Sequence, residues 1–278
     1  MFNLFADGTS AFVIDKSLSS LSGKLQNCVD TLSCWFDTWL LSVNTSKSAF
    51  MVLRSRGMSS TPLQLSIHGC AINQVCNPKH LGLTISETLT WSAHVDSVIS
   101  KASTRIGFLR RLKHRTSPLV VPELYLYCIR PIMEYASVAW AGLTKTNEQR
   151  LERGNRNAAR LITGISPSAN LPKDITLARA GLSTLKARRC LAQAQFVRRL
   201  LAGHQPRHLR RATCHWLDPR SGSNMVLRNQ DSYIRLPRPK KSILKLSPLY
   251  SSFSEWNSLP LSIRSSPSAA NLSTFFCG

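Results

Sequence analysis

The first residues of the chain contain a carboxylate at a position where it could take part in chemistry. Residues Asn3 to Ile14 consist of two short apolar runs that are joined by Asp7-Gly8. An Asp-Gly pair readily adopts the positive φ angles of a two-residue turn, and β-forming residues flank it on both sides. The stretch therefore predicts a β-hairpin that carries the Asp7 carboxylate at its exposed tip.

A second group of potential ligands lies much later in the chain and consists of Cys190, His204, His208, Cys214 and His215. Thiolates and imidazoles are the usual ligands of structural zinc sites. The spacing of this group matches no standard zinc finger, and none of the eight cysteines forms a Cys-x-x-Cys pair. Zinc binding here stays an open alternative, and reduced thiols are expected otherwise.

Positive charge is concentrated in the second part of the chain. Lys and Arg number 36 and Asp and Glu 14, which gives a formal net charge of +22. Residues 1–100 hold six of each sign, so the whole excess lies in residues 101–278. A concentrated positive field attracts polyanions through counterion release, and nucleic acid is the commonest such partner. The alternative is that these residues only serve solubility or reflect a degenerate coding region.

Two predicted helices would present this charge. The first spans Ser92 to Lys113, and the cations that lie largely off its apolar face are Lys101, Arg105 and Arg111. The second spans Asn147 to Thr163 and is ended by Gly164 in a C-cap position. The arginines that share one broad face of it are Arg150, Arg153, Arg156 and Arg160. Such faces either bind phosphates or are simply solvated, and the spacing fits both.

Apolar periodicity and turn residues predict the remaining elements. Helices are expected at residues 15–39, at 122–141 with a kink at Pro131, and at 184–203 with Ser183 as the cap. Short strands are expected at 40–44, 49–53, 63–67 and 71–75. The segment 206–245 is rich in Arg, Pro and polar residues and predicts a loop or a disordered linker. In the tail, the anchors expected for a small apolar cluster are Trp256, Leu259 and Phe275.

No segment predicts a membrane span or a secretion signal. The most apolar long stretch, residues 118–143, is interrupted by Glu123, Arg130, Pro131 and Glu134. The first residues show no basic leader. A chain of 278 residues with 43% hydrophobic content can bury a real core, in two units at typical domain sizes of roughly 100 to 200 residues. An intracellular location, in the nucleus or the cytoplasm, is therefore expected.

Several segments, taken in order, resemble the reverse transcriptase of non-LTR, jockey-like retrotransposons. The first is the hairpin around Asp7. The next are Trp-Phe-x-x-Trp-x-Leu-x-x-Asn-x-x-Lys-Ser from Trp35 to Ser48 and His-Leu-Gly-Leu-Thr-Ile from His80 to Ile85. The Trp-Asn-x-Leu-Pro segment from Trp256 to Pro260 is similar to the tail that closes such elements.

The resemblance implies roles for particular residues. In the family the hairpin reads Phe/Tyr-Ala-Asp-Asp, so Asp7 corresponds to a carboxylate that holds two catalytic Mg²⁺ ions, and Gly8 replaces its acidic neighbour. Lys47 corresponds to a lysine near the incoming triphosphate, where an ammonium can protonate or neutralise the leaving pyrophosphate; a solvated turn lysine is the alternative. Leu81 and Gly82 fall in the primer-grip block, for which an ordinary strand with a glycine bulge is the alternative.

The resemblance also implies the fold and the activity. The expected fold is α+β, with a partial polymerase palm at residues 1–91, a helical basic thumb-like region at 92–205, a basic flexible linker at 206–245 and a tail at 246–278. The family synthesises DNA on an RNA template with Mg²⁺, and its partners are the RNA and DNA of the template-primer. Its other essential Asp lies on an earlier strand, and only six residues, none of them acidic, precede Asp7.

We therefore expect a polymerase fragment that lacks the nucleotide-binding fingers and is inactive alone, with the upstream part of the same retrotransposon polyprotein as a further partner. The alternative from another functional class is a basic fragment that binds nucleic acid without catalysis.

Overall fold

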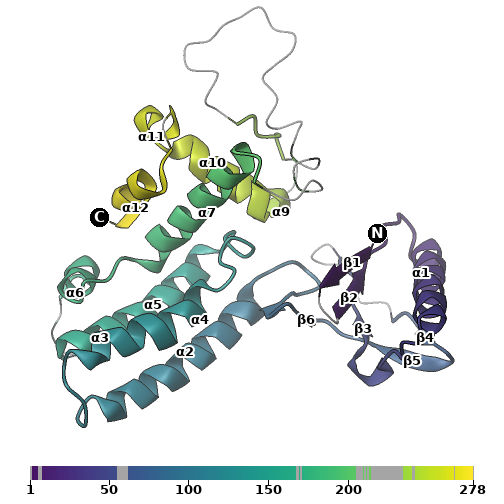
Figure 1. Ribbon diagram of the computed structural model, residues 1–278, viewed down its shortest axis with the longest axis horizontal. Coiled ribbons are helices and arrows are strands. Elements are labelled where there is room, and N and C mark those ends of the chain that lie inside the picture. Colours follow the sequence, from purple (N-terminus) through teal and green to yellow (C-terminus); the bar gives the residue numbers. More distant parts are fainter. Residues whose placement is uncertain are drawn as a thin grey trace, which may run out of the picture. The chain divides into compact units, whose positions relative to one another are not determined.

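The computed structural model describes residues 2–5, 8–54, 62–166, 169, 171–204, 209, 211, 213, 234–239, 242–265 and 267–277. The chain divides into two compact units, unit 1 over Met1–Ala93 and unit 2 over His94–Gly278 (Figure 1). Unit 1 combines short strands with a long helix, and the elements described in unit 2 are helical. The α+β class predicted from the sequence is therefore confirmed.

The strands of unit 1 form three small sheets. They are β1 (Phe2–Phe5), β2 (Gly8–Ala11), β3 (Ala49–Phe50), β4 (Leu65–Ile67), β5 (Cys70–Gln74), β6 (Lys79–His80) and β7 (Leu83–Thr84). The pairs β1–β2 and β6–β7 are antiparallel hairpins. In the third sheet, ordered β3-β5-β4, β3 runs parallel to β5 and β4 runs antiparallel to it.

The first hairpin forms as predicted, but its register differs from the prediction. Phe5 pairs with Gly8, so Gly8 is the first residue of β2 and not the second residue of the turn. The pairing of Phe5 with Gly8 leaves residues 6 and 7, in place of 7 and 8, between the two strands. Asp7 itself lies outside the described residues.

Helix α1 (Leu18–Thr38) matches the predicted amphipathic helix. It begins at the cap Ser17, whose Oγ accepts a hydrogen bond from the Ser20 amide at 3.2 Å. At its other end Leu40 has a φ of +53°, and the Leu41 amide donates to the Phe36 carbonyl at 2.8 Å. This is a Schellman-type cap with leucine in the position that glycine usually takes. The strand predicted at 40–44 is therefore wrong, because the helix cap uses its first residues.

The apolar core of unit 1 lies between α1 and the β3-β5-β4 sheet. Leu65, Ile67 and Ile72 are buried, and Leu25 and Val29 of α1 pack against them. The β4–β5 hairpin turns through His68 and Gly69, with φ angles of +49° and +76°. Two consecutive positive φ angles define the turn type that matches the twist of paired strands.

The helices of unit 2 are connected by short segments. They are α2 (Ser92–Leu112), α3 (Val120–Leu124), η2 (Tyr125–Ile129), α4 (Arg130–Glu134), α5 (Lys145–Thr163), α6 (Lys173–Arg179), α7 (Leu185–Leu201), α9 (Ser242–Lys245), α10 (Pro248–Ser258), α11 (Leu261–Ser265) and α12 (Ala269–Cys277). Helix α2 occupies almost the predicted span, and α5 ends as predicted at Gly164, which has a φ of +73°. Helix α6 was not predicted.

The helix predicted at 122–141 differs in two ways. It contains a π-helical stretch, η2, where the Arg130 amide donates to the Tyr125 carbonyl. Pro131 follows directly, and because proline has no amide hydrogen and its ring crowds the preceding turn, the regular helical hydrogen bonding is interrupted there. It also ends at Glu134, since Ala136 takes a φ of +49°, and the buried Trp140 indole then donates to the Tyr135 carbonyl at 2.9 Å.

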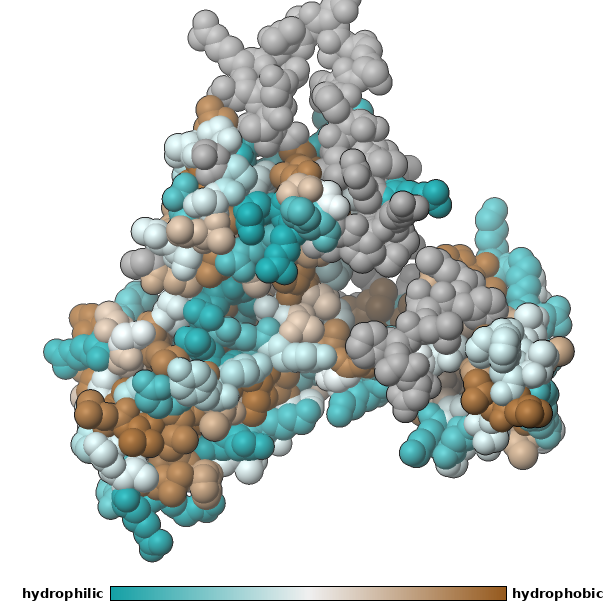
Figure 2. Space-filling model, in the orientation of Figure 1, coloured by the Kyte–Doolittle hydropathy of each residue, from teal (hydrophilic) through white to brown (hydrophobic). Residues whose placement is uncertain are grey.

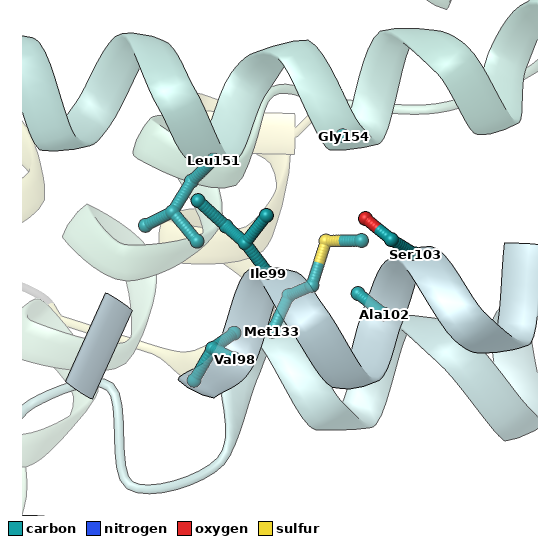
Figure 3. A pocket seen from close by; sticks show the side chains of 7 residues that line it. All are labelled: Val98, Ile99, Ala102, Ser103, Met133, Leu151 and Gly154. Atoms are coloured by element: carbon teal, nitrogen blue, oxygen red, sulfur yellow. The ribbon is translucent and has the colours of Figure 1, made fainter. Parts of the chain in front are cut away.

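Helices α2, α4 and α5 lie side by side (Figure 1), and residues of all three line one small pocket. Figure 3 shows this pocket, whose volume of about 10 Å³ is barely room for a water molecule. Two polar contacts join the ends of α2 and α5. Asp96 pairs with Arg150 at 2.5 Å, and the Lys113 ammonium donates to the Leu161 carbonyl at 2.8 Å. The two helices therefore run in the same direction.

A second apolar cluster joins α7 to the carboxyl-terminal helices (Figure 1). Its buried members are Ala194, Val197, Leu200, Ile234, Phe253, Trp256, Leu259 and Leu272. Trp256 and Leu259 are anchors as predicted, but Phe275 is 48% exposed and Phe276 packs against the cluster instead. The predicted cap Ser183 is also wrong, because Thr184 Oγ accepts from the Ala187 amide at 3.1 Å.

The Trp-Asn-x-Leu-Pro segment has a clear structural role. The Asn257 side chain accepts from the Ile234 amide at 2.9 Å and donates to the Ile234 carbonyl at 2.8 Å, as a neighbouring strand would. Most of the predicted linker 206–245 lies outside the described residues, but its last part is packed, since Ile234 is buried and Ser242–Lys245 form α9. No helix among the described residues has the length and apolar character needed to cross a bilayer.

We predict that Asn257→Ala destabilises unit 2 by about 1 to 3 kcal/mol, because it leaves the buried amide and carbonyl of Ile234 without partners. Urea unfolding of the full chain measures the effect. Ser254→Ala, on an exposed position of the same helix, is the control and should change the free energy of unfolding by less than about 0.5 kcal/mol. Equal stability of the two variants would contradict the role given to Asn257.

Candidate functional site

A large open hollow of about 870 Å³ lies within unit 1. It is bordered by β2, by the inner face of α1 and by the segment 41–50, and its floor is largely apolar, with Val29, Phe36 and Phe50 among the lining residues. Gly8 and Lys47, two of the positions that the sequence analysis singled out, both line it. The structure thus brings the first hairpin and the predicted lysine to the same hollow.

Lys47 is positioned by a short 3₁₀ turn, η1 (Thr45–Lys47). The cap of this turn is Asn44, whose Oδ1 accepts hydrogen bonds from the Lys47 amide at 3.2 Å and from the Ser46 hydroxyl at 2.6 Å. The Ser48 hydroxyl donates to the Asn44 carbonyl at 2.9 Å. The backbone of Lys47 is therefore fixed while its side chain stays exposed, an arrangement that suits a cation reaching toward an anionic ligand.

The described residues of unit 1 do not assemble a magnesium site. No carboxylate lines the described part of the hollow, and no group of three or more His, Cys, Asp or Glu side chains in the described ranges could hold a metal ion. The described carboxylates of unit 1 are Asp15, Asp30, Asp37 and Glu87, and each already has a side-chain partner. A two-metal site needs several oxygen ligands together, so Asp7 alone does not supply one.

For two of these carboxylates, Asp15 and Glu87, the partners also lower the pKa. The Lys24 ammonium, 2.6 Å away, and the Ser20 hydroxyl hold the pKa of the Asp15 carboxyl well below its usual range. The Arg54 guanidinium lowers the pKa of Glu87 in the same way. Both groups are therefore engaged in holding loops of unit 1 together.

Leu81 and Gly82 form the turn of the β6–β7 hairpin, with φ angles of +46° and +81°. Lys79 pairs with Thr84 and His80 with Leu83, so the glycine lies in a two-residue turn. The alternative of an ordinary strand with a glycine bulge is wrong, because a bulge would leave the pairing out of step. The primer-grip role of this turn stays a prediction.

Helix α2 presents the predicted cations to solvent. Lys101, Arg105 and Arg111 are exposed, and the Arg111 guanidinium lies 6.0 Å from the centre of the Phe108 ring. In Figure 2, brown apolar side chains gather over α3 and the neighbouring part of α2, and teal hydrophilic side chains border them. This part of the surface therefore mixes positive charge with exposed apolar groups.

The four arginines of α5 differ from one another. Arg150 pairs with Asp96 at 2.5 Å and donates to Asn147 at 3.3 Å, so it joins helices. Arg153 is exposed, whereas Arg156 and Arg160 are half-buried. The broad face predicted from their spacing therefore offers fewer than four cations to a ligand.

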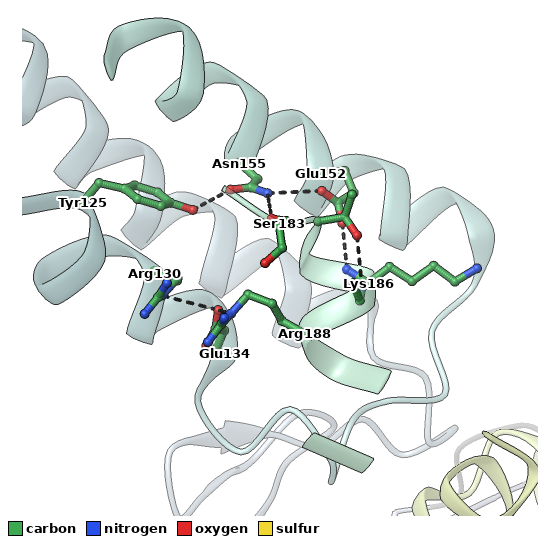
Figure 4. Close-up of polar contacts among 10 residues, drawn as sticks. Tyr125, Arg130, Glu134, Glu152, Asn155, Ser183, Lys186 and Arg188 are labelled. Atoms are coloured by element: carbon green, nitrogen blue, oxygen red, sulfur yellow. Dashed lines mark hydrogen bonds and ion pairs between the residues drawn. The ribbon is translucent and has the colours of Figure 1, made fainter. Parts of the chain in front are cut away.

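Sequence analysis missed a group of internal ion pairs in unit 2, and Figure 4 shows those that involve Glu134. Arg188 makes a two-point contact with Glu134, to which Arg130 is also 3.7 Å away. The contact with Glu134 raises the pKa of Arg188. Next to it, the buried Arg189 lies 3.3 Å from Glu148. One signal in the sequence could have indicated this. Arg189 follows the apolar Leu185 by four residues, so the two share one face of a helix and Arg189 is expected on the buried side.

The predicted zinc ligands are not brought together in the described part of the chain. Cys190 lies on α7 beside Glu255, and burial together with that carboxylate raises the pKa of its thiol to about 12. A zinc ligand needs the opposite, a stabilised thiolate. His204 is exposed at the end of α7, and the other candidates, His208, Cys214 and His215, lie outside the described residues.

Comparison with known proteins adds three relatives, all from Drosophila melanogaster. The probable RNA-directed DNA polymerase from transposon BS is 25% identical over 162 residues, 57% of this chain and 18% of that protein. The RNA-directed DNA polymerase from mobile element jockey is 23% identical over 163 residues, 58% and 18% of the two chains. The probable RNA-directed DNA polymerase from transposon X-element is 24% identical over 186 residues, 64% and 20%.

The chain is similar to retrotransposon RNA-directed DNA polymerases. This confirms the resemblance that its motifs indicated. The chain spans about a fifth of the length of these relatives. No protein-family model matches it, and no solved structure matches it significantly.

We predict that Cys190 reacts slowly with iodoacetamide at pH 8. A raised pKa leaves less of the reactive thiolate at that pH, so alkylation of the folded chain should be at least about tenfold slower at Cys190 than at the exposed Cys128. Mass spectrometry of timed samples measures both rates, and urea should make them equal. Rapid alkylation that added zinc suppresses would show instead that Cys190 is a metal ligand.

Proposed function

We propose that this chain acts as part of the RNA-directed DNA polymerase of a non-LTR retrotransposon, over the region from the catalytic hairpin to the tail. Unit 1 is a portion of the palm, and unit 2 is a thumb-like region that holds the RNA and DNA of the template-primer. The observation that carries the proposal is the similarity to three such polymerases over 57 to 64% of this chain. Such partners place the protein inside the cell, in the nucleus or the cytoplasm.

Within this proposal, the hollow of unit 1 faces the reaction. Lys47 lies near the triphosphate of the incoming nucleotide, where its exposed ammonium neutralises charge on the leaving pyrophosphate. Leu81 and Gly82 contact the primer through the tight β6–β7 turn. Support comes from the shared lining of the hollow by Lys47 and by Gly8, the neighbour of Asp7.

Asp7 contributes one ligand for Mg²⁺, which in polymerases bridges the phosphates and activates the attacking hydroxyl. Because the described carboxylates of unit 1 are paired elsewhere, the remaining ligands come from the upstream part of the same polyprotein. Gly8 in place of a second acidic residue makes this dependence stronger.

A second candidate function is nucleic-acid binding without catalysis. It is favoured by the charge, since residues 101–278 carry 30 basic and 8 acidic side chains. On α2 the cations Lys101, Arg105 and Arg111 form no ion pair in the described part of the chain. On α5, Arg153 and Arg156 likewise have no carboxylate partner there. The two candidates differ only in whether unit 1 contributes chemistry.

We predict that the chain alone does not extend a DNA primer on an RNA template with Mg²⁺ or Mn²⁺, because its described residues assemble no magnesium site. Primer extension on gels, with Asp7→Asn as the control, measures this. Template-dependent incorporation of nucleotides by the wild-type chain above that control would contradict the prediction that the chain alone is inactive. Addition of the upstream polymerase segment should restore extension, and Asp7→Asn should then abolish it; if the restored activity survives Asp7→Asn, the palm assignment is wrong.

We also predict that nucleic-acid affinity falls steeply with salt and depends on α2. The triple variant Lys101→Glu, Arg105→Glu, Arg111→Glu should reduce the slope of log affinity against log salt by about 2 to 3, because each lost phosphate contact removes roughly 0.7 to 0.9. Fluorescence anisotropy at several salt concentrations measures the slope.

The control carries the same change in net charge at exposed positions on other helices, Lys145→Glu, Arg179→Glu and Lys245→Glu. This control should change the slope of log affinity against log salt less than the α2 triple variant does. Equal effects of the two triple variants would mean that only the total charge matters and that α2 makes no particular contact.

A further inference from the structure

One side chain on α2 is out of place for a solvated helix. Phe108 is 53% exposed, although the helix has a well-formed apolar face on its other side, where Val98, Ala102, Ile106 and Leu109 are buried. Exposure of a phenylalanine ring to water is less favourable in free energy than its burial. The ring is therefore available to a partner that could cover it.

The neighbours of Phe108 are cations. Lys101, Arg105, Phe108 and Arg111 follow one another at steps of three and four residues, so they share one face of α2. The Arg111 guanidinium lies 6.0 Å from the centre of the ring, in cation–π contact, which holds the ring on this face. Between Asp96 and Glu123 the sequence contains six Lys or Arg and no acidic residue. The positive charge around the ring is therefore not neutralised by the adjacent sequence.

An exposed aromatic ring among unpaired cations matches the chemistry of single-stranded nucleic acid. Cations contact the phosphates of any nucleic acid, but an aromatic side chain stacks on a base only when the face of that base is uncovered. In a continuous duplex both faces of every internal base are covered by its neighbours. The ring therefore adds affinity only for unpaired bases, whereas Lys101, Arg105 and Arg111 add it for all forms.

We propose that Phe108 is a stacking platform for an unpaired base, and that the α2 face formed by Lys101, Arg105, Phe108 and Arg111 prefers single-stranded RNA or DNA to duplex. The proposal rests on the proposed nucleic-acid binding by unit 2 and names the form of nucleic acid that this face takes. An acidic protein segment is the competing occupant, since it too would complement the charge, but it offers no flat aromatic ring to stack on Phe108.

The test uses the full chain and four fluorescent probes of about 20 repeat units at one salt concentration. They are a single-stranded oligonucleotide, the same backbone with abasic sites in place of the bases, a blunt duplex, and poly-glutamate. The variants are Phe108→Ala, Phe108→Trp and, as a matched exposed phenylalanine on another helix, Phe275→Ala. Circular dichroism and urea unfolding verify that each variant is folded.

We expect the wild-type chain to bind the single strand most tightly. Phe108→Ala should weaken that binding about tenfold, because it removes one stacking contact. The same variant should leave the affinity for the abasic strand unchanged. Phe108→Trp should retain the affinity, and Phe275→Ala should not alter it. A 2-aminopurine base in the single strand should be quenched on binding by the wild-type chain and not by Phe108→Ala.

Two results would overturn the stacking role while leaving nucleic-acid binding intact. One is equal binding of base-bearing and abasic strands by the wild-type chain, and the other is an unchanged affinity of Phe108→Ala for the single strand. Tightest binding to poly-glutamate would assign the face to an acidic protein partner instead. Failure of the wild-type chain to bind any of the three nucleic-acid probes would remove the proposed nucleic-acid function itself.

Discussion

The buried side-chain amide of Asn155 is the interaction on which the arrangement of unit 2 depends. It accepts a hydrogen bond from the Tyr125 hydroxyl at 2.5 Å and donates to the Ser183 carbonyl at 3.2 Å and to Glu152 at 3.4 Å (Figure 4). Each partner lies on a different segment or turn, and a buried amide that loses one costs about 1 to 3 kcal/mol. The contact fixes η2, the middle of α5 and the start of α7 relative to one another, and burial of the Tyr125 hydroxyl raises its pKa so that it stays a donor.

Some arginines of unit 2 form contacts inside the unit, and others are exposed to solvent. Arg188 and Arg189 are turned inward to Glu134 and Glu148, and Arg264 donates to the Leu259 carbonyl at 2.9 Å, so these three stabilise the fold. Arg111 and Arg153 remain in solvent. The net charge of the chain therefore overstates the charge that a ligand can reach. The surface available to nucleic acid is set by pairing inside the unit as much as by composition.

In unit 1, each described carboxylate has a side-chain partner. No described carboxylate lines the hollow of this unit. A hollow of this size with a largely apolar lining leaves room for a ligand or a further polypeptide segment to cover it. It fits the proposal that the chain works together with a further part of a polymerase.

The sequence alone determined the elements whose signals are local. The spans of α1 and α2 follow from apolar residues at steps of three and four, and the end of α5 follows from Gly164, because the free energies of a helix face and a cap depend on residues within one or two turns. The order of the motifs was likewise enough to identify the resemblance. The sequence did not determine that Gly8 lies within β2, because a shift of one residue in strand register changes a turn residue into a paired strand residue.

Only the tertiary structure decided which charges act inside the protein and which face outward. Arg150 and Arg153 lie three residues apart and look alike in the sequence, yet Asp96, more than fifty residues away, pairs with the first and leaves the second to solvent. Ion pairing and burial depend on distance in space, which local sequence does not contain, and so the candidate nucleic-acid surface became visible only when the helices were packed.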